Sequence, residues 1–598
     1  MKKLFKILFF LLLPLTIEAQ TITLPKVVVT ASRIEEKETA SSITILDGEE
    51  LKKQGIINVT EALHQIPGIS ITQNGFGGVT SVYIRGGKNG QAAILIDGVP
   101  IYDPAGIDKG DLGAFLSHIQ IEDIDRIEIV RGPQSILYGS NAMTGVINII
   151  TKKGIGKPKI KLLTEGGSFN TSRESLTLSG GEENISYFLN YTRFDSDGIS
   201  KTNSKSSYFN PDKDAYREHY LGGRADLKFS DKVRFGFSLR YINAEQELDG
   251  WNDFENDRLF FTQLYYEQDL FPIWKHNLRF SYTSTNRKYE PYSFYEGTLT
   301  DFSWQHNFNL FKFFKVITGF DYRYERANTS YIEEKDLDEK AWFGEGIFNY
   351  KNLYISLGVR YTDVQDVGNK TTYRFAGAYT FPTQTKIHIS YGTGFRAPSL
   401  YQLYDTIYGN PNLKPEYSEG FDVGITQWFL NKKLSFDITY FYNDIDDLIE
   451  WVWIGPGWYD GKYFNVKEAY THGVEVSFDI LPFSWWQLGL HYTWLNAKDL
   501  TNDSWLLKRP HHRFGFSTVL SLDKCYLGIY GNYVGHYSDY LNTQVKSYFV
   551  MHAALRYKIN RHISFHVRVN NLFDRDYEET YGYNTPGISA YGGAEIIW

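Results

Sequence analysis

Two stretches in the first half of the chain carry acidic residues at a spacing that could hold a metal ion. The stretch "NPDKD" places Asn210, Asp212 and Asp214 at alternate positions, and "ELDGWNDFEND" adds Asp249 and Asp257. Alternate side chains of an extended segment point the same way, and calcium takes roughly six to eight oxygen ligands. The spacing therefore predicts a calcium site closed by two neighbouring loops. A solvated acidic loop would have the same composition, so both interpretations stay open.

A second unusual stretch is "LPKVVVTASR", which reads as a short strand because Val27, Val28 and Val29 favour extended structure. No hairpin signal follows it, and no strand of similar character lies nearby. An unpaired apolar strand at a chain end is normally a liability. Its partner is therefore expected to be another protein, although internal pairing as a first strand of the following domain is the alternative.

Signatures of catalysis are missing from the chain. It has no G-x-S-x-G and no H-E-x-x-H motif, and the adjacent His511 and His512 would point to opposite faces of a strand. Cys525 is the single cysteine, so no disulfide bond can form within the chain. The net charge of −8 argues against nucleic acid as the main partner. We therefore expect a protein that is not an enzyme.

The elements that must position these residues fall into two regions after a leader. Residues 1–19 have the pattern of a signal peptide, with Lys2 and Lys3 before an apolar core and Ala19 at its end. No later run of about 20 apolar residues predicts a membrane-spanning helix. Residues 20–155 have an α+β texture, in which a helical segment precedes several short strands separated by turn residues.

From residue 156 onward the chain alternates in polarity over segments of about ten residues, the pattern of membrane-barrel strands. In "VRFGFSLRYINAE", Phe235 and Phe237 face one way while Arg234 and Ser238 face the other. Aromatic residues make up 17% of the chain, and Tyr and Trp are favoured at the boundary between lipid and water. Since bacterial barrels have an even number of strands, we predict an all-β membrane protein with about 22 antiparallel strands in a closed barrel.

A barrel this wide would leave an open lumen unless another part of the chain filled it. The predicted organisation is a signal peptide (1–19), a periplasmic segment (20–37), an α+β plug domain (38–155) and a transmembrane β-barrel (156–598). A soluble sandwich array or propeller would show a repeat of about 40 to 50 residues, which is missing. A plain porin would require the first 155 residues to fold outside the lumen.

Several motifs resemble those of the TonB-dependent outer-membrane receptors: "KVVVTASR", "SVYIRG", "ILIDGVP", "IEIVRGPQSILYGSNAMTGVINIIT", "YGTGFRAPSLYQLYDTIYGNPNLKPE" and "NLFDRDYEETYGY". The resemblance implies that the N-terminal strand is a TonB box, formed by Lys26, Val27, Val28, Val29, Thr30, Ala31 and Ser32. Such a box would add to a sheet edge of TonB by β-augmentation. Arg85, Glu128 and Arg131 lie in the plug motifs, and we expect them to anchor the plug through charged pairs.

Within that family the resemblance is greatest to the cobalamin receptors, on "LHQIPGISITQNGFGGVTSVYIRGGKN" and "RDYEETYGYNTPG". It implies contacts with a corrinoid ligand at plug residues Val79, Ser81, Lys88, Gly106 and Ile107 and at barrel residues Gly250, Thr298, Lys508 and Tyr540. It also implies calcium ligands at Asn210, Asp212, Asp214, Asp249 and Asp257, which order the outer loops. Lys508 stands in place of an arginine and loses bidentate geometry, and Ser200 in place of an aspartate should weaken the calcium site.

The resemblance therefore implies TonB-dependent uptake of cobalamin or another corrinoid across the outer membrane of a bacterium. A receptor for a ferric siderophore or haem is the alternative. Siderophore complexes are usually anionic, whereas the plug apex "NGFGGVTSVYIRGGKNGQ" has few charges, which favours a neutral ligand. We expect a monomer in outer-membrane lipid, with TonB as its protein partner and no nucleic acid.

Overall fold

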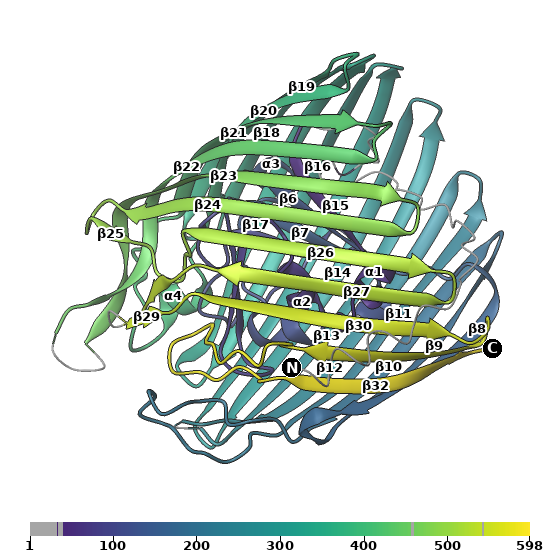
Figure 1. The fold of residues 1–598 in the computed structure, drawn as a ribbon. Coiled ribbons are helices and arrows are strands. Elements are labelled where there is room, and N and C mark those ends of the chain that lie inside the picture. The colour runs from purple at the N-terminus through teal and green to yellow at the C-terminus, as the bar shows by residue number, and fades with distance from the viewer. Residues whose placement is uncertain (1–32, 34–39, 251, 456–459, 541–542) are drawn as a thin grey trace.

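The computed structural model describes Arg33 and residues 40–250, 252–455, 460–540 and 543–598, without the side chains of Ala114 and Lys467. The predicted signal peptide and the predicted TonB box lie outside the described residues. A wide barrel of strands encloses the N-terminal part of the chain, which is coloured purple and dark blue in Figure 1. None of the helices in the described part of the chain is both long enough and apolar enough to cross a membrane.

Within the described residues, 22 strands form the closed wall, and each pairs antiparallel with its neighbours. They are β8 (Gly156–Gly167), β9 (Thr171–Glu182), β10 (Ile185–Ser196), β11 (Tyr216–Ser230), β12 (Val233–Glu247), β13 (Phe254–Phe271), β14 (Trp274–Glu290), β15 (Ser293–Phe311), β16 (Phe314–Thr329), β17 (Ile332–Tyr350), β18 (Leu353–Val364), β19 (Gly368–Thr380), β20 (Thr385–Arg396), β21 (Glu416–Phe429), β22 (Leu434–Trp453), β23 (Gly461–Phe483), β24 (Trp486–Asp499), β26 (His512–Leu522), β27 (Cys525–Val534), β30 (Tyr548–Lys558), β31 (Ile563–Asn570) and β32 (Ser589–Ile597). The pairing of β32 with β8 closes the ring. The predicted 22-stranded antiparallel barrel is confirmed.

Alternating polarity is what makes these segments wall strands. In β12, Phe235 and Phe237 are 44% and 42% exposed on the outer face, whereas Ser238 and Arg240 are buried toward the lumen. Successive side chains of a strand point to opposite faces, so this pattern presents an apolar surface to lipid and a polar one to the interior. Closure into a ring leaves no unpaired strand edge in the membrane.

The two ends of the barrel differ in the length of their connections. Asp231 and Lys232 alone join β11 to β12, whereas residues 197–215 connect β10 to β11 and residues 571–588 connect β31 to β32. The long loops carry further short elements, namely α4 (Leu400–Tyr404), β25 (Ser504–Trp505), β28 (Tyr537–Asp539) and β29 (Thr543–Val545). They gather at the left of Figure 1. Short periplasmic turns and long outer loops are the arrangement of outer-membrane barrels.

The domain inside the barrel has its own sheet and core. Its elements are β1 (Ser42–Asp47), α1 (Gly48–Lys53), α2 (Val59–Leu63), β2 (Ile69–Gln73), β3 (Thr80–Ile84), β4 (Ala92–Ile96), β5 (Val99–Pro100), η1 (Gly113–His118), η2 (Ile121–Asp123), β6 (Ile124–Arg131), α3 (Ser135–Tyr138) and β7 (Gly145–Thr151). Five strands form a sheet in the order β1-β6-β7-β4-β5, and β2 and β3 form a hairpin. Asp47 and Asn58 accept hydrogen bonds from backbone amides at the starts of α1 and α2. The sheet packs apolar residues such as Ile94, Ile127 and Ile147 into one buried cluster.

Candidate functional site

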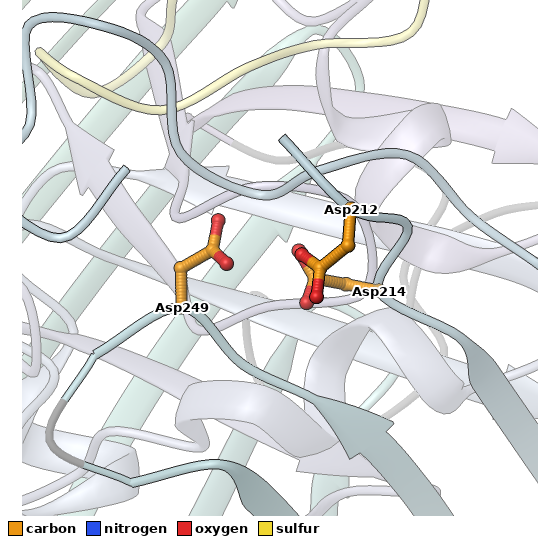
Figure 2. Close-up of side chains that lie close together, drawn as sticks. All are labelled: Asp212, Asp214 and Asp249. Carbon is orange, nitrogen blue, oxygen red and sulfur yellow. The ribbon is translucent and has the colours of Figure 1, made fainter. Parts of the chain in front are cut away.

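The acidic residues of two outer loops meet above the barrel. Asp212 and Asp214 come from the loop before β11, and Asp249 comes from the loop after β12. One carboxylate oxygen of each lies within 4.8 Å of the other two, and Figure 2 shows Asp249 approaching the other pair from the second loop. Three carboxylates this close repel one another unless a cation lies among them. The arrangement therefore suits a divalent cation that takes oxygen ligands.

Hydrogen bonds from the first loop hold these carboxylates in place. The backbone N of Lys201 donates to Asp214 Oδ2 at 2.5 Å, and Thr202 donates to Asp249 Oδ2 from its backbone N at 2.9 Å and from Oγ1 at 2.8 Å. Burial, together with the neighbouring Asp249 and Asp212, raises the pKa of Asp214 to about 6. A cation binding here would displace a proton from Asp214 over the mildly acidic range.

The other two predicted metal ligands lie differently. Asn210 borders the cluster, because its Nδ2 donates to Asp212 Oδ2 at 2.8 Å. Asp257 does not join it: the side chain is fully buried on the lumen side of β13, and Oδ2 lies 4.0 Å from Nε2 of His118 in the plug. Alternation along β13 directs Asp257 inward rather than to the loop. The expectation that Asp257 completes the loop cluster is therefore corrected.

The predicted ligand contacts of the plug lie at its outer end. They are Val79, just before β3, Ser81 within it, and Lys88, Gly106 and Ile107 in the loops that follow β3 and β5. Ile107 is 52% exposed. Lys88 Nζ donates to the carbonyl O of Ile449 at 2.6 Å and lies 3.5 Å from Asp108 and 3.6 Å from Glu450. Two carboxylates thus offset the positive charge of Lys88.

A second group of residues faces the lumen from the outer loops. Lys508 Nζ lies 3.8 Å from Asp539 and 5.0 Å from the ring centroid of Tyr540, which is 63% exposed. The sequence interpretation missed Arg509, whose Nε donates to the carbonyl O of Gly86 at 3.1 Å and whose guanidinium lies 4.4 Å from the ring centroid of Tyr83. Its position next to Lys508 in the chain was the available signal.

Two predicted barrel contacts do not join these groups. Gly250 lies in the exposed loop between β12 and β13. Thr298 follows Gly297 on β15, where a side chain would meet Asp103 and Pro104 of the plug. Since neighbouring residues of a strand face opposite sides, Thr298 lies on the outer face of the wall. The expected contact of Thr298 with the ligand is therefore corrected.

The residue that follows the predicted TonB box is held inside the barrel. Both terminal nitrogens of Arg33 lie 3.4 Å from the carboxylate oxygens of Asp321 on β16, and the guanidinium lies 4.9 Å from the ring centroids of Tyr138 and Phe343. Arg360 Nη1 donates to the same carboxylate at 2.6 Å. The sequence interpretation gave Arg33 no role in the barrel and missed this anchor.

A closed wall of 22 strands with a separately folded domain in its lumen defines a plugged receptor of the outer membrane rather than an open pore. The family model for the TonB dependent receptor-like beta-barrel matches residues 245–572, and the model for the TonB-dependent receptor plug domain matches residues 35–146. The chain belongs to the TonB-dependent receptor family, whose members are outer-membrane proteins that depend on TonB.

Curated relatives match the chain over nearly its whole length. The vitamin B12 transporter BtuB of Photobacterium profundum is 26% identical over 589 residues, which are 95% of this chain and 94% of the relative. BtuB of Vibrio vulnificus is 26% identical over 603 residues, with 96% of this chain and 94% of the relative covered.

Among solved structures, the siderophore receptor PirA of Acinetobacter baumannii has a TM-score of 0.82 at 18% identity, covering 93% of this chain and 98% of that one. The ferric enterobactin receptor PfeA of Pseudomonas aeruginosa gives 0.80 at 18% identity, covering 96% and 100%. At these identities the solved structures share the fold.

Proposed function

We propose that this receptor takes up cobalamin or a related corrinoid across the outer membrane. The observation that carries the proposal is the charge balance at the outer end of the lumen. Lys88 lies beside Asp108 and Glu450, and Lys508 lies beside Asp539. An anionic iron complex would need cations free of such carboxylates, whereas a large ligand without net charge suits paired charges and exposed aromatic surface.

Arg509 is the exception to this balance. Among the described residues no carboxylate lies within 4.0 Å of its guanidinium, which donates to the carbonyl oxygens of Gly86 and Leu507. A cation without a carboxylate partner fits one acidic group within a ligand that has no net charge, such as the phosphodiester of a cobalamin. The 26% identity to vitamin B12 transporters over 95% of the chain supports the same ligand class.

We further propose that calcium binds Asp212, Asp214 and Asp249 and orders the outer loops around the ligand. The donor set fits, because it consists of carboxylate oxygens from two loops at mutual distances below 4.8 Å. Asn584 Nδ2 donates to the carbonyl oxygens of Ser200 and Thr202 at 2.9 and 2.7 Å. An ion at this cluster would therefore fix both the 197–215 loop and the 571–588 loop that it contacts.

The energy for uptake would come through residues 26–32, which we propose to pair with a strand of TonB. Arg33 would hold the inner end of this segment against Asp321 while TonB engages its other side. Deletion of residues 25–33 should abolish uptake and leave binding of the ligand intact. Loss of binding in that deletion would contradict this separation of roles.

The direct test is titration of the detergent-solubilised receptor with cyanocobalamin, once in calcium and once in EDTA. Tight binding that weakens in EDTA supports both the ligand and the metal. Tight binding that is indifferent to EDTA supports the ligand and contradicts the calcium proposal. No binding in either condition contradicts the corrinoid proposal and makes a ferric siderophore or haem the next ligand to titrate.

A further inference from the structure

A cavity of about 180 Å³ separates one face of the plug from the barrel wall. On the plug side it is lined by α2 and by Phe76 and Gly77 of the loop between β2 and β3. On the wall side it is lined by β10, β11, β27, β30, β31 and β32 and by the 571–588 loop. The cavity therefore begins beside Val79 at the outer end of the plug and continues inward along the wall.

The cavity is polar enough to hold water. Four buried polar atoms in its lining have no hydrogen-bond partner in the protein: Thr60 Oγ1, Gln120 Oε1, His552 Nδ1 and Ser589 Oγ. Buried groups of this kind are normally satisfied by ordered water. Each water needs only about 10–15 Å³ of such space, so the cavity accommodates several waters. The cavity therefore leaves room for solvent between plug and wall, beside the packed rings of Phe76 in the plug and of Phe194 and Tyr216 in the wall.

Elsewhere the plug is fixed to the wall by ion pairs. Among the described residues these pairs reach β8, β9, β11–β14, β16 and β20–β23, and His64 lies 3.7 Å from Glu579 of the 571–588 loop, but none reaches β10, β15, β17–β19, β24, β26, β27 or β30–β32. Representative pairs are Lys109 with Glu325 on β16 at 2.6 Å and Arg85 with Glu475 on β23 at 2.9 Å. Among the described residues, therefore, no ion pair joins the plug to the strands β27 and β30–β32 that border the cavity.

The lining also suits an uncharged ligand that carries many amide groups. It combines aromatic rings, including Tyr530, Tyr548 and Tyr577, with the side-chain amides of Asn532 and Asn570. Burial raises the pKa of Glu579 to about 7 and lowers that of His64 to about 3. Neither group therefore carries a full charge under neutral conditions. Of the other two carboxylates in the lining, Glu61 has a pKa raised by burial, and Glu218 lies 3.4 Å from His118 of the plug.

From these observations we infer that the ligand leaves the outer end of the plug through this cavity, which widens when α2 and the β2–β3 loop move away from β27, β30 and β32. The inference rests on the proposed transport of a corrinoid. Pockets for drug-sized ligands measure about 300–1,000 Å³, so the cavity must widen before a corrinoid passes. The plug residues on the β20–β23 side stay attached to the wall in this opening.

Two engineered disulfides test which side opens. At Gly55, four residues before α2, an added Cβ would lie 2.7 Å from Ala554 Cβ on β30, and at Gly392 on β20 it would lie 3.2 Å from Pro133 Cβ of the plug. Both distances are shorter than the roughly 3.5–4.5 Å between the Cβ atoms of a disulfide, so each pair is within reach of a disulfide once the two backbones move slightly apart. The variants are Gly55→Cys with Ala554→Cys, which tethers the cavity side, and Pro133→Cys with Gly392→Cys, which tethers the opposite side, each with Cys525→Ser.

We expect the oxidised cavity-side tether to lose uptake of cyanocobalamin in cells while retaining binding, and reduction to restore uptake. The oxidised Pro133–Gly392 tether should import as well as its own reduced form. The reduced forms control for misfolding, including strain at Gly55, whose φ is +78°. Uptake through an oxidised cavity-side tether, or a block by the opposite tether, would overturn the inference.

A second measurement separates this inference from the identity of the ligand. Asn532→Cys lines the cavity, whereas Ser418→Cys lies on β21 on the ion-paired side. A thiol reagent should label Asn532→Cys faster in cells with TonB than in cells lacking it, and Ser418→Cys equally in both. If the wild type neither binds nor imports cyanocobalamin, the proposed ligand fails while this labelling still reports the route. Equal labelling of Asn532→Cys in both strains would refute the route.

Discussion

Glu475 in the wall and the three aspartates of the outer loops are all close-packed carboxylates, but they face different partners. Glu475 receives Arg85 through two bonds of 3.0 and 2.9 Å, and Arg131 Nε lies 3.2 Å from it. The loop aspartates face one another within 4.8 Å, with backbone amides, hydroxyls and the side-chain amide of Asn210 as their other partners.

The difference indicates how the receptor uses charge. The charge of a buried carboxylate between guanidinium groups is already neutralised. Such a carboxylate fixes the plug and has no need of a metal ion. The charge of a carboxylate cluster without a cation is not neutralised, so the geometry of the cluster depends on whether a cation or a proton binds to it. The wall therefore provides a permanent anchor, whereas the outer loops would form the part of the surface that the proposed calcium ion reorganises.

The largest effect should follow from removing the anchor. Glu475→Ala leaves Arg85 and Arg131 buried without their main partner, which should cost about 3–5 kcal/mol of plug stability. Urea denaturation in detergent, with proteolysis of the plug as the readout, measures this loss. Glu419→Ala, at an exposed position on β21, is the control and should change stability by less than about 0.5 kcal/mol. A loss below about 1 kcal/mol in Glu475→Ala would show that packing, not charge, holds the plug.

Removing one carboxylate of the outer cluster should act on ion binding instead. Asp214→Asn should lower the affinity for calcium at least about tenfold, because ligand charge sets affinity at such sites. Isothermal titration calorimetry of the receptor with calcium measures this affinity. Asp253→Asn is the control, since Asp253 lies in the second loop but outside the cluster. Equal affinity in Asp214→Asn and the wild type would mean that the loop is a solvated acidic surface.

The sequence predicted only some of the features in this comparison, because some depend on the local pattern and others on contacts between distant residues. Strand alternation is a local property, so the wall, its 22 strands and the inward face of each segment follow from period-two polarity. The anchoring role of Arg85 and Arg131 was also predicted from their motifs. Their common partner Glu475 was not, because 390 residues separate it from Arg85.

Positions beside loops were the hardest to predict. Whether Thr298 and Asp257 face the lumen, the loop or the lipid depends on register, and one residue of shift reverses the face. The contact of Arg33 with Asp321 joins residues 288 positions apart, and no local pattern marks it. The acidic cluster was found because Asp212 and Asp214 stand at alternate positions of one segment, which is a pattern visible in the local sequence.

The pH dependence of the outer cluster should change sign when calcium is present. Without an ion the pKa of Asp214 is about 6, above its ordinary value, so the folded loop binds more protons than the unfolded chain between about pH 4 and 6. Loop stability in EDTA should therefore fall as pH rises through 6. With calcium, protons compete for Asp214, so affinity should fall by up to about tenfold per unit below pH 6. Thermal melting in EDTA at about pH 5 and 7 measures how loop stability changes with pH, and calcium titrations at the same two pH values measure how affinity changes. If stability and affinity changed in the same direction with pH, the assignment of Asp214 as a calcium ligand would be contradicted.

The smallest effect should come from Lys508, because its carboxylate partner Asp539 also has hydrogen-bond donors from the backbone. Asp539 accepts hydrogen bonds from the backbone N of Tyr540 at 2.8 Å and of Tyr581 at 2.9 Å, so Lys508→Met does not leave it without partners. Plug and loop stability should therefore change by less than about 1 kcal/mol. Affinity for cyanocobalamin should fall by about 1 kcal/mol, roughly fivefold, because the cation beside the exposed ring of Tyr540 is lost.

Lys498→Met, on β24 away from this group, is the matched control for both measurements. A stability loss as large as that of Glu475→Ala, with unchanged affinity, would place Lys508 among the anchors instead of the ligand contacts.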